Sequence, residues 1–98
     1  MNNNFNDENL DLLFKAVLEL QNYEECANFF NDLCTVTELK SISQRIRVAK
    51  MLRDKSVYSD IVRTTGASTA TISRVNRSLQ YGSNGYEVLF QRIEATDE

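Results

Sequence analysis

Proline is absent from this chain of 98 residues, and glycine occurs only three times. Both residues interrupt helices, so their scarcity leaves long stretches free to be helical. Histidine is also absent, and the two cysteines, Cys26 and Cys34, do not form a CxxC pair. Because a structural zinc site needs about four ligands of these kinds, we expect no metal site and interpret both cysteines as small, buried core residues.

Long apolar runs are missing as well. Apolar stretches are only a few residues long, whereas a membrane-spanning helix needs roughly 20 residues. The first eight residues are polar and acidic, without the basic end and apolar run of a signal peptide. We therefore expect a cytoplasmic protein, and the length suits a single domain over 1–98.

A helical period of apolar residues runs through nearly the whole chain. No alternation suggests strands, so the predicted fold class is all-α. The first and last helices carry more apolar surface than a thin monomer covers, and dimerisation is one way to bury it. The predicted helices are about 7–21, one capped by Asn22 with Glu25 reaching back, about 36–54, 57–65, 69–79 and one from about Tyr86, with a frayed end at 95–98.

The third of these helices has the clearest start. Thr35 and Glu38 have the spacing of a capping box, in which each side chain bonds to the backbone N–H of the other residue. The apolar residues that follow recur at helical spacing and are predicted to face a core. They are Leu39, Ile42, Ile46, Ala49 and Leu52.

The net charge of −3 conceals an uneven distribution. Residues 1–39 carry one base against eight acids, a net charge of −7, and residues 81–98 carry −3. Residues 40–80 carry nine bases against two acids, a net charge of +7. A polyanion responds to the local field rather than to the total, so the basic middle favours a nucleic-acid partner. The alternative is that basic and acidic segments neutralise each other across a dimer.

Residues 57–79 have the pattern of a helix-turn-helix motif. Gly66 supplies a residue that tolerates positive φ at the turn between two short helices. The alternative is an ordinary helical hairpin with a surface rich in serine and threonine. The inward positions are predicted to be Ile61, Val62, Ala67, Ile72 and Val75, with Ser68 as the cap of the second helix.

The outward face of the second helix carries small and polar side chains. Small residues at its start let the backbone enter the major groove, where hydroxyl and methyl groups can contact base edges. Basic and hydroxyl side chains suit phosphate oxygens. We assign base readout to Thr69, Ala70 and Ser73, and phosphate contacts to Ser59, Thr71, Arg74, Arg77 and Arg45.

Two segments carry a family resemblance. The run Gly66-Ala-Ser-Thr-Ala-Thr-Ile-Ser-Arg-Val-Asn-Arg-Ser-Leu79, preceded by Ser43-Gln-Arg-Ile-Arg-Val48, resembles the Trp repressor superfamily, and within it the YerC/YecD-type branch of Gram-positive bacteria. The resemblance implies six helices per subunit and an intertwined homodimer. The dimerisation core of this homodimer would comprise residues 7–54 and 86–95. The DNA-reading head would comprise residues 57–79.

The resemblance also implies a corepressor site, in which two arginines enclose the indole ring of tryptophan. The matching arginines here are Arg45 and Arg74. Ser78 matches the serine near the amine of the ligand, and Thr35 matches a threonine from the partner subunit. These four residues are therefore the candidate effector pocket.

Other positions of that pocket depart from the family pattern. Val75 stands where the family has a glycine, and Cys34 and Asp32 stand where it has leucines. A β-branched side chain at the first of these positions should crowd the indole, because well-packed sites resist even one additional methylene. We therefore expect no cofactor and no binding of tryptophan.

The leading interpretation is a homodimeric, sequence-specific transcriptional regulator that binds operator DNA as a repressor. One alternative is a helical protein-interaction module without DNA binding, which the acidic ends favour. Another is a repressor that depends on a small molecule, as the tryptophan repressor does. An enzyme is not expected, because the sequence offers no histidine, no glycine loop that cradles phosphate and no plausible pair of nucleophile and base.

Overall fold

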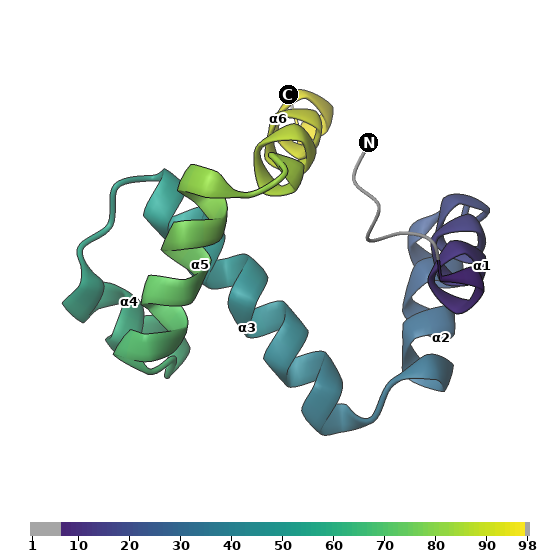
Figure 1. The fold of residues 1–98 in the computed structure, drawn as a ribbon, viewed down its shortest axis with the longest axis horizontal. Coiled ribbons are helices and arrows are strands. Elements are labelled where there is room, and N and C mark those ends of the chain that lie inside the picture. Colours follow the sequence, from purple (N-terminus) through teal and green to yellow (C-terminus); the bar gives the residue numbers. More distant parts are fainter. Residues whose placement is uncertain (1–6, 98) are drawn as a thin grey trace. The chain divides into compact units, whose positions relative to one another are not determined.

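The computed structural model describes residues 7–97, which form six α-helices and no strand (Figure 1). The prediction of an all-α, six-helix chain is therefore confirmed. Contacts within the chain group into two units, 1–39 and 40–98, and the third helix continues from one unit into the other. The helices are α1 (Glu8–Leu18), α2 (Tyr23–Leu33), α3 (Val36–Arg53), α4 (Tyr58–Thr65), α5 (Thr69–Tyr81) and α6 (Gly85–Asp97).

Capping side chains set the starts of α2 and α3. Asn22 Oδ1 accepts from the backbone N–H of Glu25 at 2.8 Å, as predicted. The Glu25 carboxylate reaches back to the N–H of Gln21 at 3.0 Å, one residue before the cap. Thr35 and Glu38 form the predicted reciprocal capping box, with N···O distances of 3.1 and 2.8 Å. Each such cap typically contributes about 1 kcal/mol.

The first unit buries no residue of α1 or α2. Leu18 is 81% exposed, and Tyr23 at the start of α2 is exposed as well. Cys26 is exposed and Cys34 is half-buried, so the prediction that both thiols are buried is wrong for this chain. The reason is that these two helices have too little apolar surface within their own unit to pack against.

The second unit has a continuous apolar core. α3, α4, α5 and α6 each contribute to it, and Figure 1 shows α4 next to α5. Full burial of one aliphatic side chain contributes about 1.5–3 kcal/mol, so this cluster dominates the stability of the unit. Its buried members are Val48, Ala49, Ile61, Ala67, Ile72, Val75 and Phe90.

The buried side of α3 differs from the prediction. Of the five apolar residues expected in the core, only Ala49 is buried, and Leu39 and Leu52 are half-buried. Ile42 and Ile46 remain exposed, the latter at 47%. Val48 was not expected in the core and is fully buried. Apolar residues lie on two sides of α3. α4 and α5 pack against the side that carries Val48.

The helix ends also differ slightly from expectation. α5 continues two residues beyond the predicted end, to Tyr81. Residues 95–97 are helical rather than frayed, and Thr96 Oγ1 donates to the Arg92 carbonyl at 2.9 Å. Glu98, the last residue of the segment expected to fray, lies outside the described residues.

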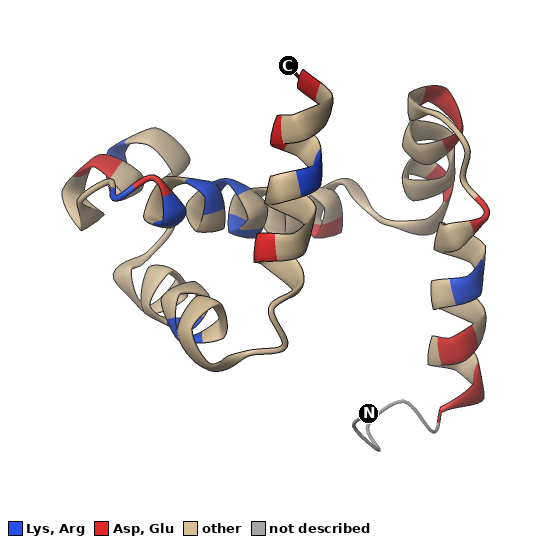
Figure 2. Cartoon of the chain, turned by 90° about the horizontal axis from the view of Figure 1, so that it is seen from above, with Lys and Arg blue, Asp and Glu red and all other residues tan. Residues whose placement is uncertain are grey.

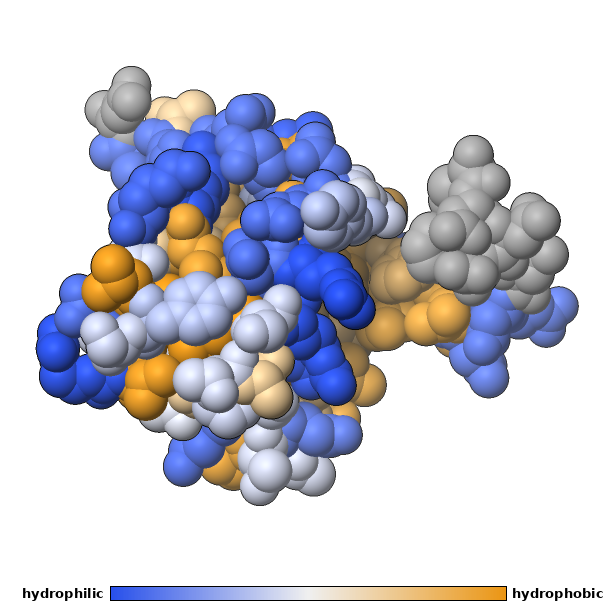
Figure 3. Space-filling view, turned by 60° about the vertical axis from the view of Figure 1, so that its left-hand side comes forward, coloured by the Kyte–Doolittle hydropathy of each residue, from blue (hydrophilic) through white to orange (hydrophobic). Residues whose placement is uncertain are grey.

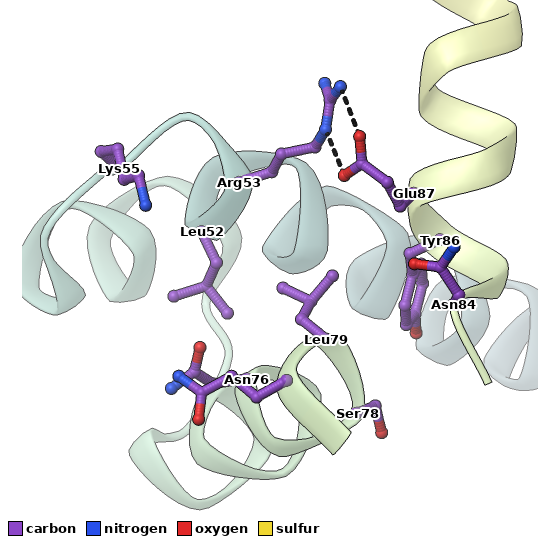
Figure 4. A pocket seen from close by; sticks show the side chains of 10 residues that line it. Leu52, Arg53, Lys55, Asn76, Ser78, Leu79, Asn84, Tyr86 and Glu87 are labelled. Carbon is purple, nitrogen blue, oxygen red and sulfur yellow. Dashed lines mark hydrogen bonds and ion pairs between the residues drawn. The ribbon is translucent and has the colours of Figure 1, made fainter. Parts of the chain in front are cut away.

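Charged side chains hold α6 against α3. The Arg53 guanidinium makes a bidentate pair with Glu87, at 2.8 and 3.0 Å (Figure 4), and also bonds to Glu94. It lies 5.8 Å from the centre of the Phe90 ring, within range of a cation–π contact. Hydrogen bonds from this guanidinium lower the pKa of Glu87 and the pKa of Glu94 below their ordinary value. The pair borders a small cavity of about 270 Å³.

This cluster predicts an acid-dependent loss of stability. Glu87 and Glu94 have lower pKa values when folded than the ordinary value of 4.5, so their stabilising effect is present above that pH. It is lost as the pH falls through the folded values. Arg53→Met should therefore reduce the difference between the free energies of unfolding at about pH 7 and about pH 3.5.

The matched control for the acid dependence is Arg63→Met. Arg63 pairs with Asp60 at 2.6 Å inside α4, and the two side chains are 75% and 46% exposed. Denaturant unfolding of both variants should show a reduced acid dependence only for Arg53→Met. An equal reduction in the two variants, or none in either, would contradict the assignment to Glu87 and Glu94.

Candidate nucleic-acid interface

The turn between α4 and α5 is built on Gly66. Its φ of +73° lies in the left-handed region, and its N–H donates to the Val62 carbonyl at 2.8 Å. A Cβ at this position would have no neighbour within 4 Å. The requirement for glycine is therefore conformational rather than steric, because other residues adopt positive φ only at a cost. The predicted turn residue is confirmed.

Hydroxyl groups on both sides of Gly66 fix the path of the chain. Thr65 Oγ1 donates to the Ile61 carbonyl at 2.7 Å and accepts from the Ala67 N–H at 3.0 Å. Ser68 Oγ accepts from the Thr71 N–H at 3.1 Å, so it caps α5 as predicted. The turn therefore delivers the first turn of α5 in a defined orientation.

The inward residues of the motif agree with the prediction in four positions of five. Ile61 and Ile72 are fully buried, and Ala67 and Val75 are 2% exposed. Val62 is the exception, with 38% exposure. Val62 follows Ile61 directly in the helix, so its side chain points about 100° away from the direction of Ile61 and out of the core.

The residues assigned to base readout lie together at the start of α5. Thr69, Ala70 and Ser73 are all exposed. Within the described residues the hydroxyl groups of Thr69 and Ser73 have no hydrogen-bond partner, so both can bond to an external group. Thr71, assigned to phosphate, is half-buried, and its hydroxyl accepts from Ser68 Oγ at 3.1 Å.

The nine bases of residues 40–80 fall into two groups. Lys50, Arg53 and Arg63 form ion pairs with acids. The other six have no acidic partner in the part of the chain that the structure describes, and Figure 2 shows cationic residues along α3 and acidic ones on α1 and α2. Ion pairs within the chain therefore neutralise a third of these basic residues. The unpaired ones are Lys40, Arg45, Arg47, Lys55, Arg74 and Arg77.

The residues assigned to phosphate contacts come from three helices. Arg74 and Arg77 lie on α5, beside the readout residues, and both are exposed. Ser59 is exposed in the first turn of α4. Arg45 is exposed on α3, where its guanidinium donates to the Ser41 hydroxyl at 3.4 Å.

The candidate effector pocket draws three of its residues from the second unit, namely Arg45, Arg74 and Ser78. Ser78 lines a mainly apolar cavity of about 560 Å³ together with Ile46 and Phe90, and neither Arg45 nor Arg74 lines it. Thr35 belongs to the first unit, where its hydroxyl caps α3. Val75 itself is packed in the core.

Sequence reasoning missed one contact that supports the motif. Gln44 Nε2 on α3 donates to the Thr65 carbonyl at the end of α4, at 3.1 Å. The bond joins two residues 21 positions apart and braces the turn against α3. The only signal in the sequence is a polar residue on the side of the helix opposite to its predicted apolar face.

Two further properties concern the described residues as a whole. In residues 7–97, no group of three or more side chains of the metal-binding types is placed to hold a metal ion. Over the same residues, no helix has both the length and the apolar character that crossing a membrane requires.

Known proteins resemble this chain closely. The family model for the Trp repressor protein matches residues 8–94. The uncharacterized protein YerC of Bacillus subtilis (strain 168) is 51% identical over 88 residues, which are 90% of this chain and 85% of that protein. A TrpR-like protein from Eubacterium eligens ATCC 27750 superposes with a TM-score of 0.89 at 52% identity, covering 95% of this chain and 96% of that one. A proposed Trp repressor from Staphylococcus aureus gives 0.85 at 52% identity, covering 90% and 88%.

Proposed function

The chain belongs to the Trp repressor protein family, a family of DNA-binding regulators, and we propose that it acts in the cytoplasm as a homodimeric repressor that binds operator DNA. This proposal depends on the composition of the outward face of α5. Small, exposed readout residues lie there beside Arg74 and Arg77, neither of which pairs with an acid in the described chain. Groups left free in this way are available to bases and phosphates.

The proposed geometry places the first turn of α5 in the major groove. Ala70 and the capping Ser68 keep the start of the helix narrow, so its backbone can approach the base edges. Thr69 and Ser73 then bond to bases, while Arg74 and Arg77 contact the flanking phosphates. The rigid turn at Gly66 holds this face in position.

Replacement of the α5 side chains should separate the two kinds of contact. Thr69→Ala and Ser73→Ala are expected to change the preferred sequence, by roughly 1–3 kcal/mol at the affected base pair. Arg74→Ala and Arg77→Ala should weaken binding to all duplexes alike. Each should also reduce the slope of log affinity against log salt by the amount expected for about one phosphate contact. Selection from a random duplex pool and salt titration measure the two effects.

Arg92→Ala is the matched control, because it removes one exposed positive charge from α6 rather than from α5. It should leave both the selected sequence and the salt dependence unchanged. A wild-type protein without salt-dependent duplex affinity would contradict the proposal and favour a protein-interaction module. An unaltered consensus in both hydroxyl variants would contradict the base-readout assignment.

Uncovered apolar surface supports the dimer. α1 and α2 bury no residue, and in the second unit Leu89 and Ile93 of α6 are 57% and 51% exposed beside Ile46 of α3. Figure 3 shows apolar residues reaching the surface between hydrophilic ones. A short chain buries a smaller fraction of its own surface than a long one. A second copy that covers these residues would complete the core.

Leu89→Glu is expected to prevent dimer formation, because it places a charge without a partner in the proposed interface. Ala95→Glu is the control, since Ala95 is exposed on α6 and does not line the apolar cavity. Sedimentation velocity at micromolar concentration, combined with circular dichroism, reports association and helix content. A wild-type protein that is a folded monomer, or a Leu89→Glu variant that remains a dimer, would overturn the proposal.

We also propose that tryptophan does not switch this repressor. Val75 occupies core volume, and the arginines of the candidate effector pocket lie outside the apolar cavity that Ser78 lines. Calorimetric titration with tryptophan at millimolar concentration should show no heat of binding, and duplex affinity should not change on its addition. Measurable binding that tightens the complex with DNA would make the protein a corepressor-dependent switch instead.

A further inference from the structure

A hollow lined by polar residues lies between α3 and the end of α4. It has a volume of about 470 Å³ and is lined by Lys40, Ser43, Gln44 and Arg47 of α3 and by Thr65 at the end of α4. The four α3 residues are spaced 0, 3, 4 and 7 along the chain, so they form one stripe of the helix. All five lining residues are polar and none is acidic. The hollow therefore presents two cationic groups and no negative charge of its own.

The two cations of the hollow take no part in the internal ion pairs. Further along α3, Lys50 pairs with Asp54 and Arg53 with Glu87. Within the described residues no carboxylate is paired with Lys40 or Arg47. Both side chains are exposed, so they are available to an anion from outside the chain.

The hollow is joined to the DNA-reading head by hydrogen bonds. Gln44, in the middle of the stripe, donates to the Thr65 carbonyl at 3.1 Å. The Thr65 hydroxyl in turn accepts from the Ala67 N–H at 3.0 Å, and Ser68 begins the capping of α5. Only three residues separate Thr65 from Thr69, the first residue of α5. These hydrogen bonds therefore connect the hollow to the turn that precedes the reading helix.

We infer that Lys40 and Arg47 bind a phosphate of the DNA backbone next to the bases read by α5. The inference rests on the proposed function and adds two residues of α3 to the phosphate contacts already assigned. A phosphate diester supplies the negative charge that the recess lacks. The guanidinium of Arg47 can bond to two phosphate oxygens at once, and the ammonium of Lys40 adds up to three donors.

The test compares two variants that are each less positive by two charges. Lys40→Gln/Arg47→Gln removes the cations of the hollow, and Lys15→Gln/Arg92→Gln removes two exposed charges from α1 and α6. Duplex binding is measured over a range of salt concentrations, with the selected operator and with a random duplex. The first variant should reduce the slope of log affinity against log salt by about 0.9 for each phosphate that the protein no longer neutralises. The second should retain the wild-type slope.

Both duplexes should weaken by the same factor in Lys40→Gln/Arg47→Gln, because phosphate contacts carry no sequence information. Equal helix content by circular dichroism would show that the variant is folded. An unchanged slope in this variant, while Arg77→Ala reduces it, would overturn the inference and leave the proposed function intact. Absence of salt-dependent binding in the wild type would overturn both.

Inorganic phosphate provides the last arm of the test. If the hollow serves the DNA backbone, titration of the free protein with inorganic phosphate should show no saturable binding at millimolar concentration. Saturable binding that Lys40→Gln/Arg47→Gln abolishes, together with unchanged duplex affinity, would assign the hollow to a free anion and overturn its assignment to DNA.

Discussion

Burial of Ile61, Ile72 and Val48 in one cluster is the interaction on which the second unit depends. Each of the three side chains is fully inaccessible and each comes from a different helix. Their packing sets the angle between α4 and α5, because a well-packed core tolerates little change in volume or direction. The outward face of α5 and the hollow on α3 are consequences of this arrangement, since both consist of what the core leaves outside.

Local patterns in the sequence were sufficient to predict the motif itself. Glycine adopts the positive φ of Gly66 at the least cost. Ile72 and Val75 are spaced one turn apart, so their burial determines which residues of α5 face outward. That is why the exposure of Thr69 and Ser73 could be predicted before any tertiary contact was known. Whether those side chains touch bases is a separate matter, because it depends on a partner rather than on the helix.

Non-local contacts explain what the sequence did not reveal. The period of α3 allows either Val48 or Ile46 to face a core, and only the position of α4 and α5 selects the former. Cys26 was assigned to a core that its own unit does not provide. Gln44 and Thr65 meet across 21 positions of the chain. Periodicity identifies which residues share a face, but not which neighbour covers that face.

The internal pairing of Lys50, Arg53 and Arg63 has a consequence for the kinetics of a DNA search. A protein that scans a genome is held on unrelated sequence by its phosphate contacts, and each additional free cation lengthens the time spent there. Carboxylates from α4, α6 and the end of α3 neutralise three of the nine cations in residues 40–80. In the proposed function, dwell time on unrelated DNA is shortened accordingly, and the hydroxyl groups at the start of α5 would then have more influence on where the protein stops.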